Sequence, residues 1–186
     1  GHAKEDWYVW APPKEDGTAL NNWLSAFGGP AWAYARTRRR YYHHKFLRQQ
    51  PKLNWRNEDA RKAALNVLET WLLRGVDGFR LDAIPYLRER EGTSTENLPE
   101  THALIRYIRG ELDRRYPGKV LLAEANQWPE DVKDYFGEGQ ECHMAFHFPL
   151  MPRMYMAIAR EDRHPITDIM RQTPDIPTSC QWAIFL

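Results

Sequence analysis

Residues 75–83 read Gly-Val-Asp-Gly-Phe-Arg-Leu-Asp-Ala and have the pattern of a short β-strand that follows a turn. At the two-residue period of a strand, Phe79 and Leu81 lie on one face, and Arg80 and Asp82 lie on the other. Two opposite charges on one face of a buried strand are costly unless they pair with each other or act on a ligand. The stretch alone leaves two interpretations open: a functional site, or an ion pair that only fixes the packing.

The segments around this stretch alternate between helical and strand patterns. Apolar residues recur at helical spacing after a helix-capping residue, Asn57, and Pro99 fits the first turn of a second helix. The predicted helices cover 57–73, 99–116, 129–136 and, with a break, 151–173, and the predicted strands cover 78–83, 119–124, 144–150 and 181–186. This alternation predicts an α/β fold with a parallel sheet and outer helices, either doubly wound or a (β/α) barrel.

Residues 1–56 contain many turn residues and few periodic patterns, which predicts irregular, loop-rich structure with embedded aromatic side chains. One basic cluster, residues 36–45, also contains tyrosines and histidines, a combination that can bind single-stranded nucleic acid. We favour a solvated basic turn that leads into a strand at Tyr41 and Tyr42, because acidic residues elsewhere cancel the positive field.

The charge balance gives no reason to expect nucleic acid or acidic lipid as a partner. Lys and Arg number 26 and Asp and Glu number 25 among 186 residues, so the net charge is +1. No apolar run approaches the length of about 20 residues that spans a bilayer, so we expect no membrane partner and a cytoplasmic location. Cys142 and Cys180 have neither the spacing of a zinc site nor that of a disulfide framework.

Two carboxylates, Asp82 and Glu124, come at the ends of two predicted strands that follow each other in the chain. Active sites of parallel α/β sheets and barrels are assembled at the carboxyl ends of the strands. With Arg80 between them, one carboxylate can stay ionised beside the cation while the other keeps its proton in a less polar environment. Such a pair can cleave a glycosidic bond, which makes the purely structural interpretation less favourable.

Several stretches of the sequence resemble known enzymes. Residues 78–83 (Gly-Phe-Arg-Leu-Asp-Ala) and 121–126 (Leu-Leu-Ala-Glu-Ala-Asn) resemble the two catalytic strand ends of the α-amylase superfamily, glycoside hydrolase family 13. Within this superfamily, residues 88–102 and 141–153 are similar to the trehalose synthases, which isomerise maltose to trehalose. The N-terminal third resembles α-glucosidases and oligo-1,6-glucosidases instead, at residues 6–11, 21–23 and 27–32.

The resemblance implies a partial (β/α)8 TIM barrel, from about strand 4 to strand 7. Residues 1–56 would be the end of a loop domain inserted after barrel strand 3, and residues 57–186 would be the catalytic barrel, truncated in strand 7. The chain stops on an apolar run without a cap or turn, which also indicates a fragment cut inside a strand. We expect such a piece to be inactive in isolation, because it leaves sheet edges and helix faces uncovered.

Carried over position by position, the resemblance implies that Asp82 is the catalytic nucleophile, that Arg80 orients it, and that Glu124 is the general acid/base of a retaining mechanism. The family's first motif, with its Asn-His pair, would precede Gly1, and its last motif, a His-Asp pair, would follow Leu186. The third catalytic acid of the family is therefore expected outside this chain.

Three further residues are candidates for substrate binding. Trp128 has an aromatic face that can stack on a sugar, although packing is an equal alternative. Asn126 lies beside it in the polar segment after Glu124, and His147 belongs to the stretch that resembles trehalose synthases. For His147 a core position is the favoured alternative.

The implied reaction is glucosyl transfer on a small oligosaccharide such as maltose, trehalose or another α-glucoside. The alternatives are hydrolysis by an α-glucosidase and, in another class, a non-catalytic amylase-like binding or interaction domain, which the retention of Asp82 and Glu124 disfavours. The resemblance implies no required cofactor and assigns no metal ligand in this chain, whereas calcium sites are common in full-length members of the family.

Overall fold

The computed structural model of the chain describes residues 2–185, which form two compact units that join at Val67 and Leu68. The junction lies inside helix α1 (Glu58–Leu72), whose N-terminus is capped by Asn57 as predicted: the Asn57 Oδ1 atom accepts a hydrogen bond from the Ala60 N–H at 3.0 Å. A junction inside a helix does not decide where a domain ends. The domain boundary after residue 56 therefore stays a prediction.

The first unit contains a three-stranded antiparallel sheet where the sequence predicted mainly irregular structure. Its strands have the order β1-β3-β2. They are β1 (Trp10–Ala11), β2 (Trp32–Ala35) and β3 (Arg40–His43), preceded by the 3-10 helix η1 (Glu5–Trp7). The prediction was right only for the basic turn and the strand at Tyr41 and Tyr42, because strands of two to four residues have too few positions to show a period.

Trp32 and His43 are buried in this unit and pack with Trp23. The rings of Trp23 and Trp32 stack at 6.0 Å, and the ring of His43 packs edge-on against Trp23 at 5.3 Å. Burial lowers the pKa of His43 to about 3, so its imidazole is neutral at physiological pH. The indole N–H of Trp32 donates to the Asn21 Oδ1 atom at 2.8 Å. These contacts assign this part of the aromatic content to packing.

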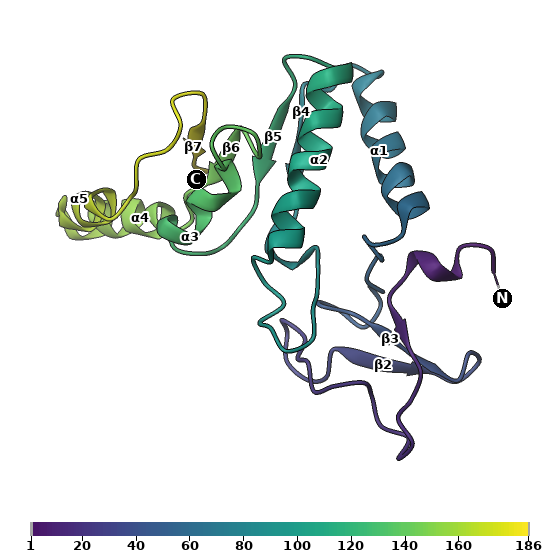
Figure 1. The fold of residues 1–186 in the computed structure, drawn as a ribbon. Coiled ribbons are helices and arrows are strands. Elements are labelled where there is room, and N and C mark those ends of the chain that lie inside the picture. The colour runs from purple at the N-terminus through teal and green to yellow at the C-terminus, as the bar shows by residue number, and fades with distance from the viewer. Residues whose placement is uncertain (1, 186) are drawn as a thin grey trace. The chain divides into compact units, whose positions relative to one another are not determined.

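The second unit contains a parallel sheet with the strand order β4-β5-β6-β7 (Figure 1). The strands are β4 (Gly78–Leu81), β5 (Val120–Ala123), β6 (Met144–Phe146) and β7 (Gln181–Ala183). The helices between them are η2 (Ile84–Tyr86), α2 (Pro99–Arg115), α3 (Pro129–Val132), η3 (Lys133–Phe136), α4 (Leu150–Arg160) and α5 (His164–Arg171). The predicted alternation and the α/β fold class are confirmed.

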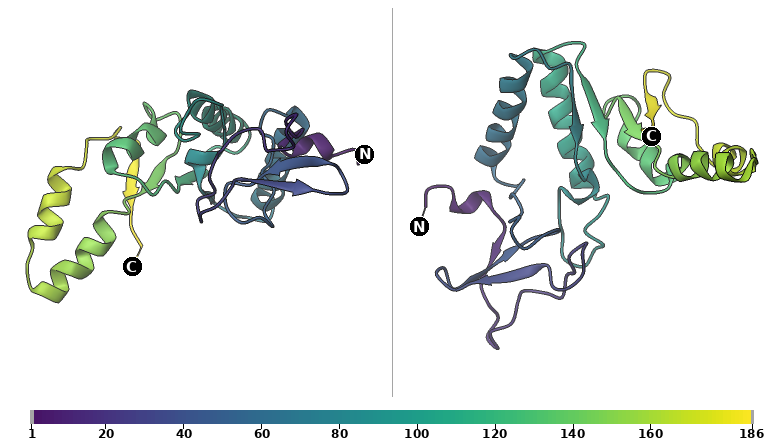
Figure 2. Two further views of the ribbon diagram at one scale, coloured as in Figure 1. Left: turned by 90° about the horizontal axis from the view of Figure 1, so that it is seen from below. Right: turned by 180° about the vertical axis from the view of Figure 1, so that it is seen from behind.

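Two element boundaries differ from the prediction. The strand predicted over 144–150 ends at Phe146, because His147 begins a turn in which its carbonyl accepts the Leu150 N–H at 3.1 Å. The last strand ends at Ala183, and the predicted extension to Leu186 reaches beyond the described residues. The break in the helical segment 151–173 is confirmed, since α4 and α5 form the helical hairpin at one end of the second unit (Figure 2).

Gly78 on β4 lies directly against Val120 on β5. A Cβ atom added there would lie 2.6 Å from the Val120 carbonyl oxygen, so only glycine fits without a shift of the backbone. From this pair the parallel register runs to Leu81 and Ala123. The residue that follows each of these two strand ends, Asp82 after β4 and Glu124 after β5, is an acidic residue.

Candidate active site

The ends of β4 and β5 bring Asp82 and Glu124 together, as the sequence predicted. Each follows directly on the last register pair of the two strands. The backbone pairing of the two strands also extends to Glu124, whose N–H donates to the Leu81 carbonyl at 3.1 Å. Regular parallel pairing is thus sufficient to place the two carboxyl groups side by side.

Arg80 lies between the two carboxylates. Its Nη2 atom is 3.3 Å from the Asp82 Oδ1 atom and 3.0 Å from the Glu124 Oε1 atom. Arg80 precedes Asp82 by two residues, so both side chains leave the same face of the strand. One guanidinium nitrogen therefore holds both acids in position and offsets their mutual repulsion.

The charges do not lie on a buried strand, and this part of the prediction is wrong. The side chains of Arg80 and Asp82 are 49% and 75% exposed, whereas that of Glu124 is 23% exposed. The two-residue period identifies which residues share a face but not what covers it. On β5 only Leu121 and Ala123 are fully buried, so that strand is buried on one face and not on both.

The two acids have different environments. The pKa of Glu124 is raised above its usual value, first by the hydrogen bond to Asp82 and second by partial burial. The N–H of Ala83, which donates to the Glu124 Oε2 atom at 2.9 Å, and the charge of Arg80 act in the opposite direction. The net upward shift keeps Glu124 protonated to higher pH than an ordinary glutamate, as a general acid requires.

The predicted substrate-binding residues lie in different surroundings. Trp128 is 53% exposed, and the guanidinium of Arg153 lies 5.5 Å from its ring centroid. Asn126 is exposed in the segment after β5. A sugar has access to both side chains, and their binding role stays a prediction.

His147 has a different position. It is buried, its Nδ1 atom accepts the Leu150 N–H at 3.2 Å, and its Nε2 atom lies 2.7 Å from the Thr173 hydroxyl. Its ring packs edge-on against Trp182 at 5.0 Å. The structure therefore places His147 in the core, the alternative favoured for it in the sequence, with both ring nitrogens engaged inside the chain.

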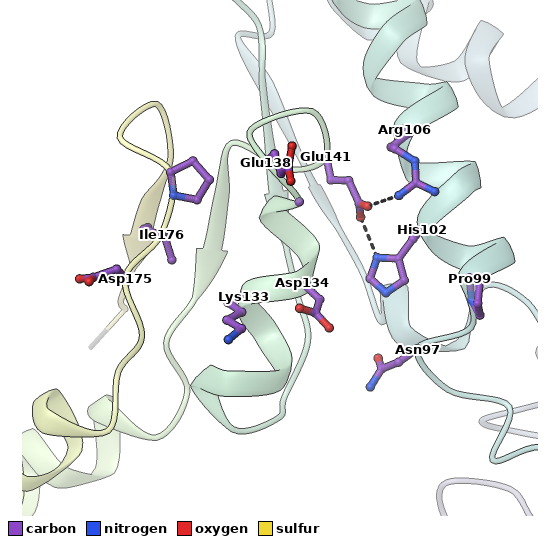
Figure 3. Close-up of a pocket in the computed structure, with 12 residues that line it drawn as sticks. Asn97, Pro99, His102, Arg106, Lys133, Asp134, Glu138, Glu141, Asp175 and Ile176 are labelled. Atoms are coloured by element: carbon purple, nitrogen blue, oxygen red, sulfur yellow. Dashed lines mark hydrogen bonds and ion pairs between the residues drawn. The ribbon is translucent and has the colours of Figure 1, made fainter.

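A separate pocket of about 550 Å³ lies between α2, the α3–η3 segment and residues 175–177 (Figure 3). None of the predicted catalytic residues lines it. At its wall the buried Glu141 carboxylate receives hydrogen bonds from Arg106 at 2.6 Å and from His102 at 2.8 Å. The Glu141 carbonyl also accepts a hydrogen bond from Arg109 at 2.8 Å. The network joins α2 to the segment before β6, which is a structural role that the sequence did not indicate.

We expect a Glu141→Gln substitution to destabilise the complete protein by about 1–3 kcal/mol, because a buried charged acceptor of two side-chain donors is replaced by an amide. The matched control is Glu138→Gln, the same chemical change at an exposed residue of the same pocket. Denaturant-induced unfolding measures the free energy of unfolding of both variants. Equal free energies of unfolding for the two variants would contradict a structural role for Glu141.

Within residues 2–185, no cluster of three or more His, Cys, Asp and Glu residues is arranged to hold a metal ion. None of the helices in this range is long and apolar enough to cross a bilayer. Cys142 and Cys180 are both buried free thiols.

The sequence matches the family described as alpha amylase, catalytic domain, over residues 2–176. Among curated proteins, it is 52% identical over 185 residues to a trehalose synthase/amylase of Mycobacterium tuberculosis, covering 97% of this chain and 31% of that protein. It is 49% identical over 182 residues to a trehalose synthase of Thermus thermophilus, covering 97% and 19%. A probable alpha-glucosidase of Rhizobium meliloti is 36% identical over 181 residues, covering 81% and 33%.

Solved structures show the same fold. The alpha-glucosyl transfer enzyme XgtA superposes with a TM-score of 0.75 at 35% identity, covering 100% of this chain and 39% of that one. An isomaltulose synthase from Klebsiella superposes with a TM-score of 0.72 at 29% identity, covering 81% and 30%. The chain thus spans about a third or less of the length of these curated relatives. The fold class, a partial (β/α) barrel, agrees with these neighbours.

Proposed function

Because the chain belongs to the α-amylase catalytic-domain family, we propose that it carries two of the catalytic acids of a retaining glucosyl-transferring enzyme that interconverts maltose and trehalose. The observation that supports this proposal is the arrangement of Asp82, Arg80 and Glu124 at two adjacent strand ends. The relatives with the higher identities, named trehalose synthases, favour the isomerase within the family.

The proposed first step is cleavage of the glycosidic bond. Glu124 donates its proton to the glycosidic oxygen while an Asp82 carboxylate oxygen attacks the anomeric carbon, which gives a glucosyl-enzyme ester and free glucose. The raised pKa of Glu124 suits the acid role. Arg80 holds the Asp82 oxygen in position. Because the scissile bond has to lie between the two carboxyl groups, the substrate must enter between them as it binds.

The proposed second step reverses the first with a different nucleophile. Glu124, now ionised, takes the proton from an attacking hydroxyl group, and the ester bond to Asp82 breaks. Attack by the anomeric hydroxyl of the retained glucose gives trehalose, attack by its 4-hydroxyl regenerates maltose, and attack by water gives hydrolysis. Carboxyl groups supply both the acid and the nucleophile, so the proposed reaction requires no cofactor. Calcium binding in the complete protein stays a proposal.

Hydrolysis by an α-glucosidase is the second candidate, because a probable alpha-glucosidase is also among the relatives. Incubation of the complete protein with maltose distinguishes the isomerase from the glucosidase. The isomerase yields mainly trehalose and the glucosidase mainly glucose, as measured by proton NMR of the anomeric signals. Incubation with trehalose is the matched reverse experiment, in which the isomerase yields maltose. If neither sugar reacts, the proposed function is wrong.

A further inference from the structure

The residue after Asp82 has an unusual backbone conformation. Ala83 has φ 49° and ψ 42°, in the left-handed region. A side chain crowds the backbone in this region, so glycine is the residue that adopts it without cost. Ala83 nevertheless holds it at the point where β4 ends and η2 begins. A strained residue persists where its surroundings determine it, and it often serves a function there.

The left-handed turn directs two successive N–H groups toward one residue. The Ala83 N–H donates to the Oε2 atom of Glu124 at 2.9 Å, and the Ile84 N–H donates to the Glu124 carbonyl at 3.3 Å. Oε1, the other carboxylate oxygen, lies 3.0 Å from Arg80. Both oxygens of Glu124 therefore have a donor, one from the backbone and one from a side chain. Two donors fix the plane of a carboxyl group, whereas one would leave it free to rotate.

We propose that Ala83 is a positioning residue for Glu124: its left-handed backbone turns the N–H onto Oε2 and fixes the orientation of the carboxyl group toward the substrate. The inference rests on the proposed acid/base role of Glu124. It assigns a role to a main-chain group, which a change of the Ala83 side chain affects only through the backbone conformation.

The contact also affects protonation. An N–H donor favours the ionised carboxylate, so the Ala83 N–H lowers the pKa of Glu124 against the larger raising effects of Asp82 and burial. Loss of the N–H must therefore raise the pKa of Glu124 further. Since Glu124 acts as the acid, the loss of activity at alkaline pH reports its deprotonation. Removal of the donor moves this alkaline limb of the profile to higher pH.

The test replaces Ala83 by lactic acid in the complete protein, through suppression of a stop codon. This substitution keeps the methyl side chain and exchanges the N–H for an ester oxygen. We expect the alkaline limb of the kcat/KM profile for maltose to move up by about one to two pH units, the size of a hydrogen bond to a charged group. A uniform fall of kcat/KM at all pH values, with the limb unmoved, would overturn the proposal.

Two encoded variants accompany the ester. Ala83→Gly keeps the N–H and suits the left-handed region, so its alkaline limb should match that of the parent protein. Ala83→Val keeps the N–H but disfavours the left-handed region, so the N–H turns away from Glu124 and the limb should move in the same direction as in the ester. A limb that moves in the glycine variant, or that stays in place in the valine variant, would contradict the proposal.

A second readout does not depend on turnover. The carboxyl carbon of Glu124 can be titrated by carbon NMR in protein labelled at glutamate, with the signal assigned by its absence in Glu124→Gln. A higher pKa of this carboxyl in the ester variant supports the positioning role even if maltose is not a substrate. Coinciding titration curves overturn it even if maltose is one. Failure of the inference and failure of the proposed function are therefore distinguishable.

Discussion

An Asp82→Asn variant of the complete protein should lose glucosyl transfer by about 10⁴-fold or more in kcat/KM for maltose. An amide does not attack the anomeric carbon, and loss of a nucleophile removes a step that no other group of the site replaces. The change is nearly isosteric, and the amide oxygen still accepts from Arg80. The fold should therefore be unchanged. If the circular dichroism spectrum and the melting temperature equal those of the parent protein, the loss of activity results from the missing nucleophile and not from unfolding.

The matched control for this variant is Asp77→Asn. Asp77 precedes the same strand, its side chain is 93% exposed, and its carboxylate pairs with Lys119 at 2.7 Å. The same chemical change there should leave kcat/KM within a factor of two or so of the parent. An undiminished rate in Asp82→Asn would contradict the nucleophile assignment and would favour a non-catalytic amylase-like domain.

External azide adds a test of stereochemistry. In an Asp82→Ala variant, azide that enters the vacated space should attack α-glucosyl fluoride directly and give β-glucosyl azide. This substrate is suitable because fluoride leaves without a proton from Glu124. Product of the α configuration would show that another group still forms a covalent intermediate.

The meeting of Asp82 and Glu124 could be predicted from the sequence because it depends only on regular structure. The two-residue period placed Arg80 and Asp82 on one face, and the alternation of helices and strands indicated parallel pairing. Parallel strands end at a common edge, so terminal carboxylates of neighbouring strands become neighbours in space.

The exposure of the same residues could not be predicted in this way. Periodicity describes one strand, whereas burial depends on what covers the sheet. The antiparallel sheet of the first unit was missed for a related reason. Pairs such as Trp32 with His43 join segments across turns, and each strand is too short to carry a signal of its own.

The conformation of Ala83 had no signal in the sequence. Glycine or asparagine indicates a left-handed position, and alanine does not. The hydrogen bond that accompanies the turn is donated by the Ala83 N–H to Glu124, which lies 41 residues further along the chain. The buried network of Glu141 was missed similarly, since its donors are on another helix and nothing local distinguishes it from an exposed glutamate.

A Glu124→Gln variant of the complete protein should lower kcat/KM for maltose by about 10²–10⁴-fold, the usual contribution of general acid/base catalysis. The pKa of Glu124 is raised in the folded protein, so its proton is retained to higher pH than that of an ordinary glutamate and is lost as the pH rises through this pKa. An amide has no such titration. The alkaline limb of the pH profile should therefore disappear in the variant, which loss of structure alone would not cause.

A substrate with a better leaving group distinguishes the role of the general acid from that of the nucleophile. With 4-nitrophenyl α-glucoside, whose leaving group needs no proton, Glu124→Gln should form the glucosyl-enzyme nearly as fast as the parent, and Asp82→Asn should not. Azide should release the intermediate as α-glucosyl azide, because Asp82 has already inverted the anomeric carbon once. The control is Glu130→Gln, an exposed glutamate of α3, which should behave as the parent. Equal losses on maltose and on the activated substrate would reject Glu124 as the acid.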